Sequence, residues 1–200
     1  MSALTELYQE IRSCSKCDIA RSRTRAVPGE GPENAEIMFI GEAPGFHEDQ
    51  QGLPFVGQAG QFLNELLNSV GLKRPDVYIT NIIKSRPPGN RDPLPVEISC
   101  CKPWLDRQIE IIRPRMIVTL GRYSLARFFP GKTIGQVHGT SIVSNAGLCF
   151  AMYHPAAALH QQSLRETLVR DMQKIPGLLA TAQKKPDTAG QEGMTQLPLF

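Results

Sequence analysis

The sequence predicts an α/β protein, a three-layer α/β/α sandwich with a central four-stranded parallel sheet. Four short apolar runs are typical of buried strands, and segments with helical spacing of apolar residues separate them. Strands that alternate with helices favour a parallel sheet that is covered on both faces. The composition agrees, because 200 residues with 41% hydrophobic and 20% charged side chains suit the core of a single domain.

The expected elements follow one another along the chain. A helix is predicted over residues 3–12, where apolar residues recur at Leu4, Leu7, Tyr8 and Ile11. Strands rich in Ile, Val, Phe or Met are expected at 36–40, 77–80, 116–120 and 149–153. Helices are expected at 58–70, at 95–112, which has Pro at its first position, and at 163–179. After about residue 180 the composition becomes polar, which predicts a folded domain over 1–180 and a flexible tail over 181–200.

Charge and composition narrow the class of protein. With 22 Lys and Arg against 19 Asp and Glu, the net charge of +3 neither requires nor excludes a nucleic-acid partner. The sequence has no apolar run of the roughly 18 residues that span a membrane, and its start lacks the pattern of a secretory signal. These observations predict a cytoplasmic protein, in which five cysteines are expected to be metal ligands or buried thiols rather than disulfides.

The residues at the strand ends are the candidates for function, because ligands bind at the carboxyl ends of strands in such sheets. Glu42 follows the first strand, Asn81 ends the second, His154 follows the fourth, and Phe55 lies in a Gly- and Pro-rich loop. Each has an ordinary alternative role: a solvated acid, a loop cap, a structural histidine or a core aromatic. Together they can bind and cleave a flat, polar group. The chain has neither GxGxxG nor Gly-Lys-Ser/Thr, so no nucleotide cofactor is expected.

Five motifs in matching order carry a resemblance to a known family. They are GEAPG-x-x-ED, GLPFVGQAG, VYITN-x-x-K-x-RPPGNRDP, E-x-x-x-C-x-P-W-L-x-x-Q-I and YHPAAAL. This combination closely resembles the uracil-DNA glycosylases, in particular the iron–sulfur-containing family 4. The resemblance implies that family's version of the sandwich. It also implies a monofunctional base-excision-repair enzyme that flips deoxyuridine out of DNA, hydrolyses the N-glycosidic bond and leaves an abasic site.

The resemblance also implies a role for each candidate. Glu42 and His154 would be catalytic, with Glu42 activating the attacking water and His154 donating a hydrogen bond to uracil O2 as the base leaves. Phe55 would stack on the base, and Asn81 would contact O4 and N3–H. Backbone groups of Gly41 and Ala43 would complete the pocket, and the loop around His47 and Glu48 would crowd the 5-position and exclude thymine.

Basic side chains after Asn81 are expected to contact DNA phosphates, namely Lys84, Arg86 and Arg91. Leu159 is a candidate wedge into the base stack, or alternatively an ordinary apolar contact at a helix start. The partner implied is uracil-containing DNA, single- or double-stranded, bound by a monomer.

The cysteines depart from the family's pattern at one position. The resemblance implies a [4Fe–4S] cluster held by Cys14, Cys17, Cys101 and a cysteine where this chain has Ser85. Cys100 is one substitute for the missing thiolate. Alternatively Ser85 or an incomplete ligand set holds the cluster, or this branch has lost it. Without the resemblance, the cysteine spacing suggests zinc as readily.

The last residues resemble the bacterial sliding-clamp binding motif, with Gln196, Leu197, Leu199 and Phe200 as its positions. The alternative is a frayed tail.

For the whole chain, two other functions stay open: a uracil-DNA binding or trapping protein with weak turnover, and a zinc-stabilised DNA-binding module.

Overall fold

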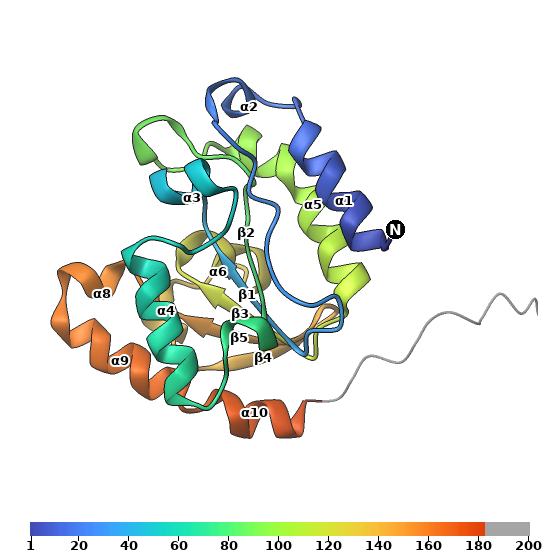
Figure 1. The fold of residues 1–200 in the computed structure, drawn as a ribbon. Helices are drawn as coiled ribbons and strands as arrows, with labels where there is room; N and C mark the ends of the chain where they lie inside the picture. Colours follow the sequence, from blue (N-terminus) through green and yellow to red (C-terminus); the bar gives the residue numbers. More distant parts are fainter. Residues whose placement is uncertain (183–200) are drawn as a thin grey trace, which may run out of the picture.

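One central sheet organises the protein in the computed structural model, which describes residues 1–182. The sheet has five strands in the order β2-β1-β3-β5-β4 (Figure 1). Their bounds are Ile37–Gly41 (β1), Tyr78–Asn81 (β2), Met116–Leu120 (β3), Ser141–Ser144 (β4) and Gly147–Met152 (β5). The four predicted strands are present and pair in parallel. The prediction of four strands in all was wrong, because β4 pairs antiparallel with β5.

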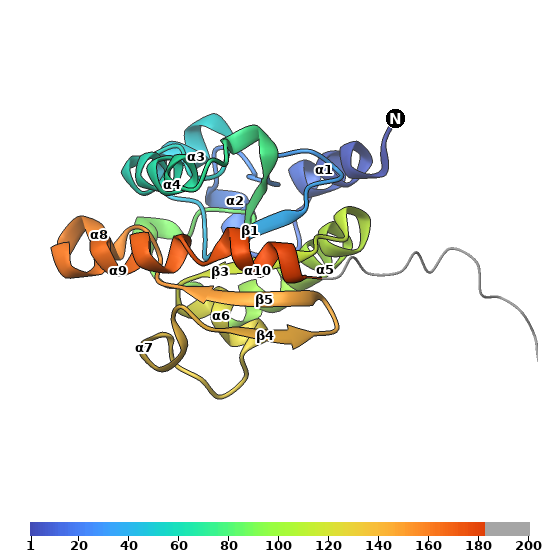
Figure 2. The ribbon, with the colours of Figure 1, turned by 90° about the horizontal axis from the view of Figure 1, so that it is seen from below.

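Strand β4 lies at the edge of the sheet (Figure 2). Its sequence, Ser-Ile-Val-Ser, has no buried residue, and Val143 is 86% exposed. The apolar runs that predicted the other strands exist because those strands are covered on both faces. An edge strand that is short and exposed gives no such signal.

Helices cover both faces of the sheet (Figure 1). The longer ones are α1 (Ala3–Ser13), α4 (Gln58–Ser69), α5 (Pro95–Ile112) and α9 (Gln162–Met172). The shorter ones are α2 (Ile19–Ser22), α3 (Phe46–Gln51), α6 (Arg122–Phe128), α7 (Ile134–Val137), α8 (Ala157–His160) and α10 (Ile175–Thr181). The single helix expected at 163–179 is therefore two helices, and α10 begins anew with Pro176 in its first turn. No described helix has the length and apolar character needed to cross a membrane.

Two apolar clusters hold the layers together. Along β1, Ile37 and Phe39 pack in a cluster with α4 and α9, whereas Met38 and Ile40 pack in the other cluster with α1 and α5. Alternate residues of a strand point to opposite faces, so each of the four parallel strands contributes to both clusters. The sheet is therefore a rigid support for the residues that follow the carboxyl ends of its parallel strands.

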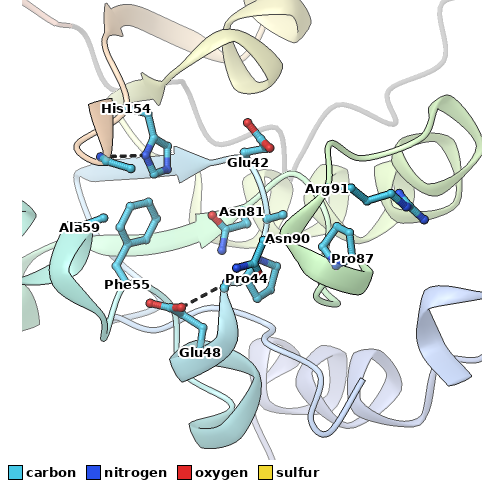
Figure 3. A pocket seen from close by; sticks show the side chains of 13 residues that line it. Glu42, Pro44, Glu48, Phe55, Ala59, Asn81, Pro87, Asn90, Arg91 and His154 are labelled. Carbon is cyan, nitrogen blue, oxygen red and sulfur yellow. Dashed lines mark hydrogen bonds between the residues drawn. The ribbon is translucent and has the colours of Figure 1, made fainter. Parts of the chain in front are cut away.

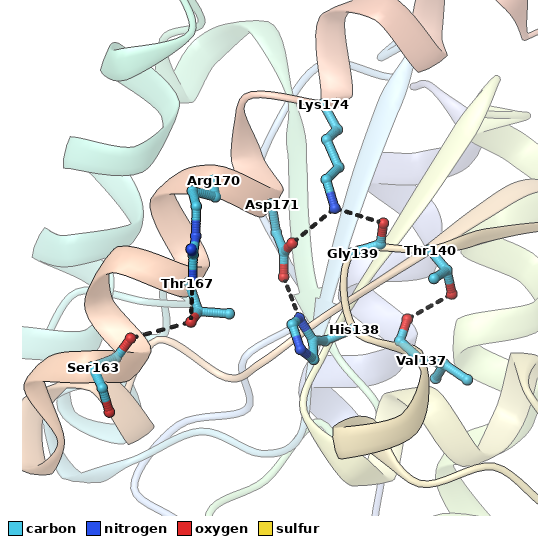
Figure 4. A network of polar contacts seen from close by, with 9 residues as sticks. All are labelled: Val137, His138, Gly139, Thr140, Ser163, Thr167, Arg170, Asp171 and Lys174. Carbon is cyan, nitrogen blue, oxygen red and sulfur yellow. Dashed lines mark hydrogen bonds and ion pairs between the residues drawn. The ribbon is translucent and has the colours of Figure 1, made fainter.

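A polar network joins the end of α9 to the segment between α7 and β4 (Figure 4). The buried Asp171 of α9 bonds His138 Nδ1 through Oδ2 at 2.8 Å and pairs with Lys174 Nζ at 3.2 Å. Lys174 also donates to the Gly139 carbonyl at 3.0 Å, and the His138 ring lies 4.8 Å from that of Tyr153. The network thus braces the chain immediately before His154.

Candidate active site

A pocket of about 230 Å³ lies where the carboxyl ends of the parallel strands meet (Figure 3). It gathers residues from four separate segments. Its lining consists of Glu42, Ala43, Pro44, Gly45, Glu48, Phe55, Ala59, Asn81, Pro87, Asn90, Arg91, His154 and Ala156. The structure therefore brings together Glu42, Ala43, Phe55, Asn81 and His154. Pockets for drug-sized ligands span about 300–1,000 Å³, so this one suits a smaller molecule or a single group of a larger one.

Glu42 is the first residue after β1 and is half-buried. Burial raises the pKa of its carboxyl group, and the charge of Asp92 adds to that rise, whereas Arg122 lowers the pKa. Asp92 and Arg122 form an exposed ion pair with each other. A carboxylate with a raised pKa beside a pocket is suited to accept a proton from water.

Phe55 forms an apolar wall of the pocket and is 5% exposed. Its φ of 51° is left-handed, a conformation that strains a bulky side chain. Arg74 holds this backbone by donating to the Phe55 carbonyl at 3.1 Å. Gly60 packs so closely that a Cβ there would lie 1.8 Å from the same oxygen. The ring is thereby held nearly parallel to that of His154, with centroids 5.5 Å apart.

Asn81 ends β2 and is buried. Its Oδ1 has no hydrogen-bond partner among the described residues, which costs about 1–3 kcal/mol when no ligand supplies a donor. The absence of a side chain at Gly41 of the neighbouring strand makes room for this oxygen, since a Cβ at position 41 would lie 2.4 Å from Oδ1. Asn81 therefore brings a buried acceptor without a partner to the wall of the pocket.

His154 follows β5 and borders the pocket with part of its ring. Burial lowers its pKa from 6.5 to about 4, so the imidazole is neutral at neutral pH. Its Nδ1 accepts a hydrogen bond from the Ala156 amide at 3.1 Å. A neutral imidazole carries one proton, and here it must reside on Nε2. His154 is thus a neutral donor, suited to an oxygen that gains negative charge.

Glu48 lines the pocket, and it has a role that the sequence did not indicate. Its carboxylate accepts a hydrogen bond from the amide of Gly45 at 3.1 Å (Figure 3). It also accepts from the amides of Val56 and Gly57, both at 2.9 Å. These bonds tie the loop after β1 to the loop that carries Phe55. The spacing of Gly45 and Glu48 was a possible signal, because an acid three residues after a helix cap is typical of a capping box.

His47 was expected to contact the substrate, but it is not among the residues that line the pocket. Its exposed ring lies beside Gly57. Successive side chains of a helix point in different directions, so the turn that brings Glu48 to the pocket carries His47 away. Gly41, which was also expected in the pocket, is not a lining residue either. It contributes to the shape of the site because its lack of a side chain lets Asn81 and Phe55 approach the backbone of β1 closely.

The residues expected to bind DNA have different environments. Arg91 lines the pocket and forms a two-pronged ion pair with Glu97, Arg86 is partly exposed nearby, and Leu159 is 40% exposed on α8. The prediction that Lys84 contacts DNA phosphates was wrong. The side chain is buried, and its ammonium group donates to Thr80 Oγ1, the Asn81 carbonyl and Gln108 Oε1, each at 2.7 Å. Its burial, which lowers its pKa to about 7, excludes a phosphate contact.

Four cysteines gather between the N-terminal segment and α5. Cys14 and Cys17 pack against the cluster that contains the buried Cys101, and Cys100 Sγ donates to the Lys16 carbonyl at 3.5 Å. Burial raises the pKa of Cys17, and it raises that of Cys101 to about 11. All cysteines are free, and the described residues include no group of three or more side chains already arranged to hold a metal ion.

Ser85, which stands where the family has a cysteine, is buried, and its hydroxyl already has a partner. Arg23 Nη1 donates to Ser85 Oγ at 2.9 Å, and Nη2 donates to the carbonyls of Arg12 and Cys14. The hydroxyl of Ser85 is thus already a hydrogen-bond acceptor. The same guanidinium links the residue after α2 to the chain segment that leads into the cysteine pair.

The chemistry of the pocket follows from its parts. It has a flat apolar wall, an unpartnered acceptor, a neutral donor and a carboxylate of raised pKa. Such a set can hold a small polar ring, stabilise negative charge on it and activate water against a bond to it.

Comparisons with known proteins agree with this chemistry. Residues 28–174 match the family model described as the uracil DNA glycosylase superfamily. The chain is 47% identical to the type-4 uracil-DNA glycosylase of Sulfurisphaera tokodaii over 92% of this chain and 88% of that protein. It is 45% identical to that of Archaeoglobus fulgidus over 92% and 96% of the two chains. With that of Thermotoga maritima it shares 42% identity over 88% and 95%.

Proposed function

Because this chain belongs to the uracil DNA glycosylase superfamily, we propose that it is a monofunctional uracil-DNA glycosylase that flips deoxyuridine out of DNA and hydrolyses its N-glycosidic bond. The observation that carries the proposal is the buried, unpartnered Oδ1 of Asn81. Uracil offers a donor, N3–H, beside an acceptor, O4, and a side-chain amide offers the complementary pair. Binding the base would satisfy an acceptor that the protein leaves open.

The pocket also limits how the base arrives. Its volume of about 230 Å³ suits one base rather than a base pair, so the nucleotide must leave the DNA stack to enter. The ring of Phe55 supplies a stacking surface for it, an interaction worth about 1–3 kcal/mol. This gain offsets part of the few kcal/mol that extrusion costs.

Hydrolysis then needs two groups. His154, neutral and with its proton on Nε2, would donate to uracil O2 and stabilise the negative charge of the leaving base. Glu42 would orient or deprotonate the attacking water and stabilise positive charge on the sugar. The products are free uracil and DNA with an abasic site.

The function is tested by incubating the chain with a uracil-containing oligonucleotide and separating the strands on a denaturing gel. We expect an abasic product that alkali cleaves, from single- and double-stranded DNA. A covalent adduct would instead identify a trapping protein, an alternative that the names of the relatives do not favour. Binding with neither product would favour a DNA-binding module.

Recognition by Asn81 gives a specificity prediction. The Asn81→Asp variant is expected to lose about 5- to 150-fold in uracil excision and to gain detectable cytosine excision, because a carboxyl group can accept from the cytosine amino group. Both rates are measured on matched oligonucleotides. Asn68→Asp, at an exposed position of α4, serves as the control and should change neither rate. Unaltered base preference in Asn81→Asp would contradict the role of this amide.

We further propose that Cys14, Cys17, Cys100 and Cys101 hold a [4Fe–4S] cluster. Four thiols share one neighbourhood, since the charges of Cys14 and Cys100 act on Cys17, and those of Cys14 and Cys17 act on Cys101. The raised pKa values of Cys17 and Cys101 favour neutral thiols until a metal centre supplies positive charge. The cluster would have a structural role, joining the N-terminal segment to α5.

Cys100 is the better fourth ligand, because the hydroxyl of Ser85 already accepts from Arg23. We expect the brown wild-type protein to contain about four iron and four sulfide per chain. Cys100→Ser should lose iron, whereas Ser85→Ala and the control Cys149→Ser, a buried position in β5, should retain it. The reverse pattern for Cys100 and Ser85 would assign the ligand to Ser85, and zinc in the purified protein would refute the cluster.

The proposed clamp motif lies outside the described residues and rests on sequence alone. We propose that Gln196, Leu197, Leu199 and Phe200 bind the groove of a bacterial sliding clamp. Deleting residues 196–200 is expected to abolish clamp binding in a pull-down and to leave excision on short oligonucleotides unchanged. Clamp binding by the truncated chain would refute the motif.

Three further expectations from the sequence stay predictions. They are a cytoplasmic location, a monomeric state and a folded domain that ends near residue 180.

A further inference from the structure

An exposed aromatic residue lies next to the pocket and has no part in the chemistry above. Phe46 is the first residue of α3 and is 51% exposed. It directly follows Pro44 and Gly45, which line the pocket. A large apolar ring that stays half-exposed forgoes much of the free energy of burial, so core packing does not explain its position.

A cation contacts this ring and links it to Asn90, another residue of the pocket. The guanidinium carbon of Arg86 lies 5.1 Å from the Phe46 ring centroid, in a cation–π contact. Arg86 Nε donates to Asn90 Oδ1 at 2.6 Å, and Asn90 lines the pocket. Asn90 itself has a left-handed φ of 56°, which the turn after Pro88 imposes. Phe46, Arg86 and Asn90 thus form a continuous ledge, here called the rim ledge, that joins α3 to the loop after β2.

The chemistry of the rim ledge matches single-stranded nucleic acid. Sites for unpaired strands combine aromatic faces, on which bases stack, with positive charge for the backbone. The ledge has an exposed aromatic ring and a guanidinium, and Arg91 lines the adjoining pocket. When one nucleotide enters the pocket, the base beside it loses a stacking neighbour, and the exposed Phe46 directly follows the lining residues Pro44 and Gly45.

We propose that Phe46, held by Arg86, is a stacking platform for the unpaired nucleobase next to the extruded uracil on the same strand. This inference rests on the proposed glycosylase function and adds a second base-binding subsite to it. Stacking of a base on an aromatic side chain is worth a factor of about 5 to 150 in affinity. The platform lies outside the reacting atoms, so its effect should fall on substrate affinity rather than on the chemical step.

The test compares two single-stranded substrates with one uracil each. In the first, normal bases flank the uracil, and in the second, abasic spacers replace both flanking bases. Single-turnover excision is measured over a range of enzyme concentrations for wild type, Phe46→Ala, Phe46→Trp and the control Val143→Ala, whose residue is exposed on the edge strand β4. Thermal unfolding of each variant checks that it is folded.

For wild type and Val143→Ala, we expect half-saturation to require about 5- to 150-fold more enzyme on the spacer substrate. Phe46→Ala should weaken binding to the normal substrate by a similar factor, lose little more on the spacer substrate and keep the wild-type maximal rate. Phe46→Trp should retain the preference for flanking bases. Equal losses on both substrates, or no loss, would overturn the platform. Absence of uracil release by wild type from any substrate would refute the proposed function instead.

Discussion

Glu42→Gln is expected to slow uracil excision by about 10²- to 10⁴-fold while leaving binding of uracil-containing DNA intact. The substitution keeps the size of the side chain but removes the proton acceptor beside the pocket. Single-turnover rates measure the chemical step, and fluorescence anisotropy measures binding. Glu65→Gln, on α4 and paired with Arg165, is the matched control and should keep wild-type rates. A Glu42→Gln rate within a few-fold of wild type would exclude Glu42 as the group that activates water.

The raised pKa of Glu42 gives this prediction a pH dependence. The carboxylate is the active form, so the wild-type rate should fall as the pH decreases through that raised pKa. Asp92 raises the pKa and Arg122 lowers it. Asp92→Asn should therefore move the acidic fall in rate to lower pH, and Arg122→Gln should move it to higher pH, most clearly at low salt. Shifts in the same direction for both variants would contradict this electrostatic arrangement.

His154→Ala is expected to reduce the excision rate by about 10²- to 10³-fold, because it removes the donor that would stabilise the departing base. The exposed His160 of α8 provides the control His160→Ala, which should be unaffected. With a pKa of about 4, His154 does not change charge between pH 5 and 8, so it adds no inflection to the rate profile there. Wild-type excision by His154→Ala would refute the leaving-group role.

The same pKa predicts how His154 affects stability. The unfolded histidine takes up a proton near pH 6.5, whereas the folded one stays neutral until about pH 4. The unfolded state therefore binds more protons between these values, and the free energy of unfolding should decrease as the pH falls from 6.5 to 4. His154→Ala should show a shallower decrease in urea titrations over this range.

Much of the site was predictable, because its residues follow strands whose apolar runs are unmistakable. Glu42, Asn81 and His154 converge since parallel strands end at one edge of the sheet. The role of Glu48 in joining two loops was not predictable, because it depends on amides eight and nine residues further along the chain, whose position only the fold supplies.

Other features depend on tertiary surroundings that a sequence does not display. Lys84 was assigned to the surface by its charge, but three acceptors from β2 and α5 compensate its burial. Ser85 looked like a vacant ligand position, whereas Arg23 engages its hydroxyl. Strand β4 was missed because an exposed edge lacks the apolar run of a buried strand.

The order of strands also constrains when the protein can become active. Strand β5 comes last along the chain, yet it is inserted between β3 and β4, and it carries the histidine of the pocket. A nascent chain that has emerged from the ribosome only as far as β3 can present Glu42, Phe55 and Asn81 but not His154. Uracil release should therefore begin late and abruptly during synthesis or refolding, in step with closure of this last parallel pairing.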